Sequence, residues 1–193
     1  MRKSKAETAE SRAKILSKAA QLLRERGTEG ASVAGVMEAA GMTQGGFYRH
    51  FKSKDDMLAS ATRQAFGEVV ERFDRHRSRA GAGVALQAYV KDYLSSRHIE
   101  HPAFGCPVAA FGCDAGRMQD ALGTEFVRGA EELIERAASG LEATSKAGGA
   151  DARAAAIQSL SMLVGAVVIA RALGKSELRS EIVAACKGKL LPE

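Results

Sequence analysis

The chain has 193 residues, of which 46% are hydrophobic, 26% charged and 5% aromatic. It is long enough to bury a core without disulfide or metal staples, and three cysteines at irregular spacing exclude a disulfide-stapled secreted scaffold. No apolar stretch follows the basic N-terminal residues, and the longest uncharged run, 154–170, is shorter than the roughly 20 residues of a membrane-spanning helix. We therefore expect a soluble cytoplasmic protein with no membrane partner.

The net charge of +5 is unevenly distributed along the sequence. Residues 1–80 contain sixteen Lys or Arg against ten Asp or Glu, whereas residues 81–193 contain twelve against thirteen. A basic excess in one part of a chain is typical of a nucleic-acid or anionic-surface partner. A solvated basic face without a partner fits the same counts.

Helical periodicity runs through most of the chain, and alternating strand patterns are absent. The first apolar stripe predicts a helix that ends at Gly27. The second predicts a helix that begins after Ser32, a suitable N-cap, and ends at Gly41. A short third helix is expected over 43–50, with Thr43 as its cap.

A long helix capped by Ser53 is predicted over 54–77, and the sequence Ala-Gly-Ala-Gly at 80–83 predicts a break after it. Further helices are expected over 86–94, 122–141, 151–173 and from Ser176 onward, with an irregular segment over 101–116. The fold class is therefore all-α, with about nine helices.

Residues 32–58 contain the most informative pattern of the sequence. A helix, a tight turn at Gly41 and Met42, and a second short helix follow one another. Glycine at position 41 permits the positive φ that ends the first of the two helices. Two helices joined in this way form a helix-turn-helix unit, whose second helix enters the major groove of DNA.

These residues resemble the N-terminal domain of the TetR family of bacterial transcriptional regulators, over roughly residues 10–60. The resemblance rests on Val36, the Ala39-Ala40-Gly41 turn, Thr43, Gly45, the Phe47-Tyr48-Arg49-His50-Phe51 cluster, Ser53-Lys54-Asp55 and Leu58. It implies an arm and DNA-binding domain over 1–53 with three helices. It also implies a larger helical domain for ligand binding and dimerisation over 54–193, with helix 54–78 connecting the two.

The motif also predicts roles for individual residues. Phe47 and Phe51, four residues apart, are expected to pack inward. The resemblance implies that Tyr48 and Lys54 bind DNA phosphates, and Gln44 and Arg49 can make bidentate contacts to base edges. The full set expected at the DNA is Ser32, Val33, Met42, Thr43, Gln44, Gly45, Gly46, Tyr48, Arg49, His50 and Lys54.

Five of the ten aromatic residues lie between positions 86 and 126, around Cys106. A mostly apolar cavity with a few polar groups is typical of a small-molecule site. We therefore expect an apolar or electrophilic effector to bind at Tyr89, Tyr93, Phe104, Cys106, Phe111 and Phe126. Cys106 is either a reactive thiol with a lowered pKa near a helix start or a buried wall of this pocket.

The helix predicted over 151–173 is apolar on nearly all sides, which predicts burial against both its own core and a partner chain. Ser161 and Gly165 lie in a strip of small residues that permits close approach of helices. We expect a homodimer whose interface includes Ser161, Gly165, Val168 and Ile182.

The leading interpretation is a homodimeric, ligand-responsive regulator, a repressor that binds a pseudo-palindromic operator. One alternative is a thiol-dependent redox enzyme or sensor that uses Cys106, and another is a structural DNA-binding protein without ligand control. His98, His101 and Cys106 match no familiar closed zinc site. We therefore expect no metal, no cofactor and no catalytic residues, so the chain is not predicted to be an enzyme.

Overall fold

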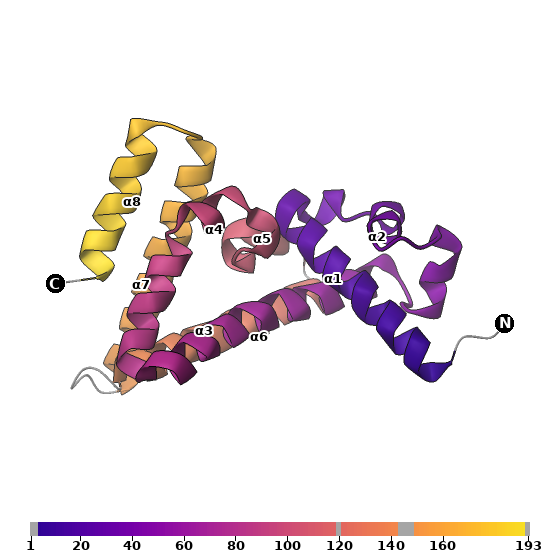
Figure 1. Ribbon diagram of the computed structural model, residues 1–193, viewed down its shortest axis with the longest axis horizontal. Helices are drawn as coiled ribbons and strands as arrows, with labels where there is room; N and C mark the ends of the chain where they lie inside the picture. The colour runs from indigo at the N-terminus through magenta and orange to yellow at the C-terminus, as the bar shows by residue number, and fades with distance from the viewer. Residues whose placement is uncertain (1–3, 119–120, 143–148, 192–193) are drawn as a thin grey trace.

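The structure is a computed structural model that describes residues 4–118, 121–142 and 149–191. Over these residues the chain is all-α without strands, which confirms the predicted fold class (Figure 1). Eight α-helices and two short 3₁₀ helices follow one another: α1 (Lys5–Gly30), α2 (Val33–Ala39), η1 (Gln44–Arg49), α3 (Lys54–Tyr93), α4 (Ser96–Glu100), η2 (Pro102–Phe104), α5 (Pro107–Ala115), α6 (Ala121–Glu142), α7 (Gly149–Ala172) and α8 (Glu177–Leu190).

The predicted helix boundaries at Ser32, Gly41 and Ser53 are confirmed, whereas the predicted end at Gly27 is a bend within α1, which continues to Gly30. Gly27 and Gly41 have φ angles of 69° and 70°, which residues with a Cβ atom rarely adopt. The Ser32 and Ser53 hydroxyls accept hydrogen bonds from backbone N–H groups three residues later, at 3.1 Å each. Thr43 occupies the predicted N-cap position of η1, but its side chain makes no capping hydrogen bond.

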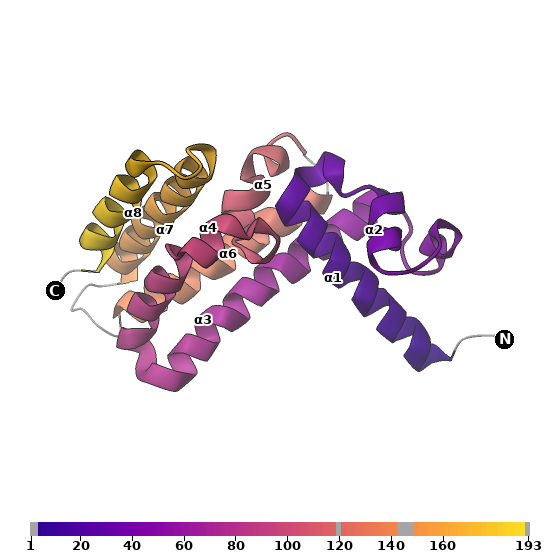
Figure 2. The ribbon, with the colours of Figure 1, turned by 45° about the horizontal axis from the view of Figure 1, so that its top comes forward.

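Helix α3 joins two segments that the sequence predicts as separate helices. The chain continues in helical conformation from Lys54 to Tyr93, but Gly81 has a φ of 78° and a ψ of 164°. This conformation interrupts the i to i+4 hydrogen bonds and bends the helix. The predicted break at 80–83 is therefore present as a bend within one long element (Figure 2).

Two hydrophobic clusters form most of the core. The first joins α1, α2 and η1 to the first turns of α3, and also includes Phe111 of α5 and Leu122 of α6. The second lies between the remainder of α3 and helices α4 to α7, around Phe73, Tyr93 and Val167. Helix α5 lies between the two clusters and contributes side chains to both.

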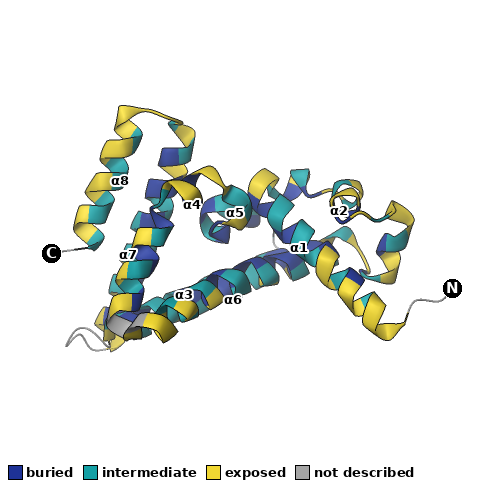
Figure 3. Ribbon diagram, in the orientation of Figure 1, coloured by how far each residue is buried: buried dark blue, intermediate teal, exposed yellow. Residues whose placement is uncertain are grey.

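Helix α8 and the outer face of α7 are largely exposed (Figure 3). By length and composition α7 could cross a membrane, and 28% of its most apolar window is buried within the chain. Ile157, Val168 and Ile169 of α7 are 42–46% exposed, and Leu178 of α8 is 51% exposed. No residue of α8 is buried within the single chain. This α7–α8 face is therefore an exposed apolar surface.

Candidate nucleic-acid interface

The conformation of η1 is maintained by two phenylalanines on its inner side. Phe47 and Phe51 are 0% and 2% exposed, and their rings stack with centroids 5.5 Å apart. Both belong to the first hydrophobic cluster, together with Ile15 and Val36. The prediction that these two residues pack inward is confirmed. Their burial fixes the orientation of η1 and therefore which of its side chains face the solvent.

Tyr48 lies between these two phenylalanines in the sequence but faces the opposite way. Its side chain is 78% exposed, and its ring meets Phe47 edge-on at 5.2 Å between centroids. An exposed tyrosine with its base held in place presents a hydroxyl to an outside partner at low entropic cost. Gln44 and Arg49 are exposed on the same short element.

Arg12 of α1 contributes to this site, although the sequence did not suggest it. Its Nε donates to the backbone carbonyl of His50 at 3.3 Å, and its guanidinium lies 4.8 Å from the centre of the Phe51 ring. A cation above an aromatic face is attracted by the ring quadrupole. Arg12 therefore fixes the end of η1 from the α1 side.

The eleven residues predicted to lie at the DNA fall into two groups in the structure. Six are exposed: Ser32, Thr43, Gln44, Gly45, Tyr48 and Arg49. Five are half-buried: Val33, Met42, Gly46, His50 and Lys54. Of the half-buried group, Val33 and Met42 pack against the first hydrophobic cluster, so part of each side chain serves the core.

The two glycines of η1 are not required by close contacts within the protein. A Cβ built on Gly45 would meet nothing within 4 Å, and one on Gly46 would lie 3.7 Å from the Met37 Cε, an ordinary contact. The small side chains therefore leave open space on the outer side of η1, where a large partner can approach the backbone.

Two polar contacts join this region to the rest of the molecule. Arg24 of α1 has a fully buried side chain, and its Nη2 lies 2.6 Å from Glu68 Oε2 of α3. The backbone N–H of Thr28 donates to Asp114 Oδ2 of α5 at 3.0 Å, just after the bend at Gly27. Helix α1 is therefore connected by hydrogen bonds to both α3 and α5.

The six residues predicted as one effector site are not brought together. Tyr89, Tyr93 and Cys106 are buried in the second cluster. Phe111 and Phe126 pack instead with each other, and Phe126 meets Phe66 edge-on at 5.2 Å between centroids. Phe104 is 53% exposed on η2. The aromatic side chains thus occupy three separate environments.

His98 organises the part of this region around Cys106. Its Nδ1 donates to the Tyr93 carbonyl at 2.6 Å, and its Nε2 accepts from the backbone N–H of Cys106 at 2.9 Å. Burial lowers the pKa of His98 from 6.5 to about 4, so the ring is neutral near pH 7. Burial also raises the pKa of the Cys106 thiol, which disfavours the reactive interpretation of this cysteine.

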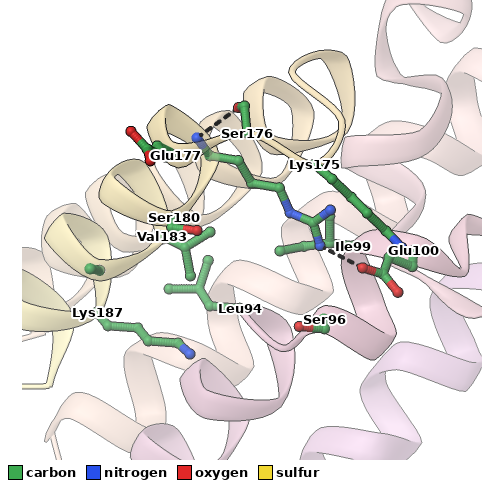
Figure 4. Close-up of a pocket in the computed structure, with 12 residues that line it drawn as sticks. Leu94, Ser96, Ile99, Glu100, Lys175, Ser176, Glu177, Ser180, Val183 and Lys187 are labelled. Carbon is green, nitrogen blue, oxygen red and sulfur yellow. Dashed lines mark hydrogen bonds and ion pairs between the residues drawn. The ribbon is translucent and has the colours of Figure 1, made fainter.

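Two cavities adjoin this region. One of about 670 Å³ lies between α4 and α8, lined by Leu94, Ile99 and Val183 beneath the ion pair of Glu100 with Arg179 (Figure 4). The other, of about 540 Å³, lies between α3 and the α4–η2 segment and is lined mainly by arginine and histidine. No described group of three or more His, Cys, Asp or Glu side chains is arranged to hold a metal ion.

The residues predicted at a dimer interface all lie on the α7–α8 face. Ser161 and Val168 are exposed, and Gly165 is half-buried with no atom within 4 Å of a Cβ built on it. Ile182 is half-buried on α8 and packs partly against the second cluster. The open space at Gly165 permits another helix to approach α7 closely.

Known proteins are similar to this region in sequence. Residues 15–61 match the family described as bacterial regulatory proteins, tetR family. The chain is 23% identical over 121 residues to the HTH-type transcriptional repressor DhaR of Mycobacterium sp., and 32% identical over 114 residues to the HTH-type transcriptional repressor BepR of Brucella suis biovar 1. These alignments cover 63% and 59% of this chain, and 60% and 49% of the two relatives.

The similarity of fold extends over nearly the whole chain. The crystal structure of a TetR-family transcriptional regulator from Agrobacterium tumefaciens aligns with a TM-score of 0.79 at 19% identity. The alignment covers 94% of this chain and 98% of that one. Residues 15–61 therefore match the tetR family of bacterial regulatory proteins, and the chain as a whole has the fold of a TetR-family transcriptional regulator.

Proposed function

We propose that the protein is a homodimeric, ligand-responsive transcriptional regulator, a repressor that binds a pseudo-palindromic DNA operator. The observation that carries this proposal is the geometry of η1, where Gln44, Tyr48 and Arg49 are exposed and Phe47 and Phe51 are buried. A short helix with exposed amide, phenol and guanidinium groups suits the major groove and its phosphate walls. DNA binding is assigned to 1–53, and effector binding and dimerisation to 54–193, with helix 54–78 connecting them.

The proposed dimer uses the α7–α8 face. Ile157, Val168 and Leu178 are exposed on this face, and contiguous exposed apolar surface marks interaction sites, so these residues favour a second subunit covering the face. The proposal requires a two-fold axis that places both copies of η1 on one side of the dimer. Successive major grooves on one side of DNA are about 34 Å apart, so the operator would be an inverted repeat with half-sites about one turn or a small multiple apart.

The proposed effector is a small molecule that binds within 54–193 in the cytoplasm. An apolar or electrophilic compound at Tyr89, Tyr93 and Cys106 must first move the α4–η2 segment, because Cys106 is only 1% exposed. Such a movement would reach α5, and through Asp114 the end of α1. The effector would thereby alter the position of the two DNA-binding domains.

A gel-shift or fluorescence-anisotropy titration with the promoter of the protein's own gene tests this function. We expect binding that depends on sequence and weakens steeply with salt, because several Lys and Arg contact phosphates. Equal affinity for a scrambled sequence of the same length would contradict the regulator and favour the structural DNA-binding alternative. A catalytic activity that requires the Cys106 thiol would favour the enzyme alternative.

A further inference from the structure

The cavity of about 540 Å³ between α3 and the α4–η2 segment, here called the arginine cleft, has an unusual lining. Its charged residues are four arginines and one aspartate, joined by three histidines and the exposed ring of Phe104. The basic members come from both sides of the cleft: Arg72, Arg75, His76 and Arg79 from α3, and Arg97, His98 and His101 from α4 and the residue after it.

The spacing of the α3 arginines concentrates positive charge on one side of the helix. Arg72, Arg75 and Arg79 follow one another at three and four residues, so all three lie on the same face. Like charges at this spacing repel and destabilise a helix that has no counter-charge. Arg97 adds a further positive charge from the opposite wall.

The described residues neutralise only part of this charge. Arg72 lies 3.9 Å from Asp92, and Arg75 lies 3.8 Å from Glu71 outside the cleft. Among the described residues, Arg79 and Arg97 have no ion-pair partner. A cleft with two unpaired guanidinium groups attracts small anions and holds them by bidentate hydrogen bonds.

The walls of the cleft are held by specific contacts rather than by loose surface side chains. Arg72 Nη2 donates to the Phe104 carbonyl at 2.7 Å, which ties η2 to α3. Arg171 of α7 donates to the carbonyls of His98, Ile99 and Ala109 at 2.9–3.2 Å, which fixes the other wall from behind. The backbone of the two walls is therefore fixed before a ligand binds, while the Arg79 and Arg97 side chains are exposed.

Operator DNA is an unsuitable partner for this charge. Arg72 follows Lys54 by 18 residues along α3, which at 1.5 Å per residue places it about 27 Å farther along the helix. The α4–η2 segment on the other wall is likewise remote from η1 in both views (Figures 1 and 2). The basic residues 72–79 thus contribute to the charge excess of the first 80 residues without contributing to the DNA-binding surface.

We propose that the arginine cleft binds a small molecule with two or more anionic groups, phosphate or carboxylate, and an aromatic or apolar part that lies against Phe104. The proposal rests on the proposed function only for the consequence of binding, because the anionic ligand would be a second effector, at a site separate from Tyr89 and Cys106. The floor of the cleft is His98, which contacts Tyr93 and Cys106, so the ligand acts on the same region from its polar side.

Isothermal titration calorimetry on the full-length protein in 50 mM salt tests the site without DNA. The probes are pyrophosphate, ADP and benzene-1,3-dicarboxylate, with adenosine and benzene-1,3-dimethanol as uncharged counterparts. We expect at least one dianionic probe to bind with a Kd below about 100 μM, a value within reach of a small ligand, and the uncharged counterparts not to bind. Binding by only the phosphates or only the dicarboxylate identifies the anionic group, and either result supports the site.

Arg79→Gln and Arg97→Gln should each weaken this binding at least tenfold, while Arg77→Gln should leave it within twofold. Arg77 is a matched control because it is exposed on the same helix but does not line the cleft. Absence of binding by all three anions, equal binding of the uncharged counterparts, or an equal loss with Arg77→Gln would overturn the proposal. Operator binding measured without any anion is a separate readout, so the cleft and the regulatory function can fail independently.

Discussion

Two adjacent residues of η1, Phe47 and Tyr48, differ almost completely in exposure, at 0% and 78%. The difference arises because this six-residue helix has room for one buried face, which Phe47 occupies and against which Phe51, two residues after the helix, stacks. Each side chain on the opposite face is then available to DNA. The chemistry of each exposed group determines whether it contributes affinity or sequence preference.

We expect Tyr48→Ala and Lys54→Ala to weaken binding to all DNA sequences by a similar factor and to reduce the salt dependence. Gln44→Ala and Arg49→Ala should instead change which bases are preferred, since a bidentate base contact contributes about 1–3 kcal/mol of discrimination. Selection from a randomised operator library, followed by titration at two salt concentrations, distinguishes the two pairs. Identical sequence profiles for all four variants would contradict these roles.

The buried His98 predicts a pH dependence of stability. Its pKa is about 4 in the folded protein and near 6.5 in the unfolded chain, so the unfolded chain binds more protons between these values. Stability therefore falls as pH decreases through 6.5, and by pH 5 the loss from this one group is roughly 2 kcal/mol. Below pH 4 the loss from this group reaches its full value.

Urea titrations at pH 7.5 and pH 5, at one protein concentration, measure this effect. His98→Gln keeps an amide that can replace both ring hydrogen bonds but cannot titrate, so its loss between the two pH values should be smaller by roughly 2 kcal/mol. His76→Gln, at the surface of the same cleft, is the control. The same pH dependence in wild type and His98→Gln would show that other groups cause it.

At the scale of the elements, the contact between α1 and α5 is one of two that attach the DNA-binding region to the rest of the chain, beside the Arg24–Glu68 pair with α3. Asp114 accepts from the backbone N–H of Thr28 at 3.0 Å, and a Cβ on Gly27 would clash with the same carboxylate. The positive φ of Gly27 turns the chain so that this N–H points at α5. The backbone conformation at Gly27 and the position of the Asp114 side chain therefore depend on each other at this contact between α1 and α5.

Asp114→Ala should leave the Thr28 N–H without its partner and lower the free energy of unfolding by about 1–3 kcal/mol. Because the joint also fixes α1 relative to α5, operator affinity should decrease even at temperatures where the variant is fully folded. Thermal unfolding and an anisotropy titration measure the two effects. Asp151→Ala, an exposed carboxylate on α7, is the matched control and should change neither.

Helix boundaries that depend on local contacts could be predicted from the sequence. Ser32 and Ser53 bond to N–H groups only three residues away, and Gly41 adopts a φ angle that favours glycine. The 3₁₀ form of η1 could not be predicted, because over six residues tertiary contacts such as the burial of Phe47 outweigh helix propensity.

The effector region was predicted less well because one helix serves two cores. Phe111 of α5 faces the first cluster, whereas Cys106 and Ala109 face the second. Proximity in sequence therefore does not indicate which side chains share a cavity. The arginine cleft has a similar explanation, since the spacing of Arg72, Arg75 and Arg79 is visible in the sequence but the approach of Arg97 depends on the fold.

At the scale of the whole molecule, the α7–α8 face provides a test of the proposed dimer. Val168→Glu places a charge at a position that is 46% exposed in the single chain, so each subunit should fold normally. In a dimer the same charge would be buried without a partner, at a cost of several kcal/mol. The association constant of the dimer should therefore fall at least a hundredfold. Sedimentation equilibrium measures the change.

Val127→Glu is the matched control, because Val127 is 59% exposed on α6, away from this face. It should leave the association constant unchanged. Operator affinity should fall with Val168→Glu because one subunit contacts only half of an inverted repeat. A dimer of wild-type strength with Val168→Glu would place the interface on another surface.

Helix α8 has no buried residue within one chain, and this affects newly synthesised subunits before they form the proposed dimer. A ribosome releases subunits singly, so the last helix remains weakly held until two chains meet. Segments held by few contacts open readily, and proteases act on the open form. We therefore expect scarce subunits to be trimmed from the α8 end sooner than abundant ones, so that the rate of synthesis influences the lifetime of the protein as well as its amount.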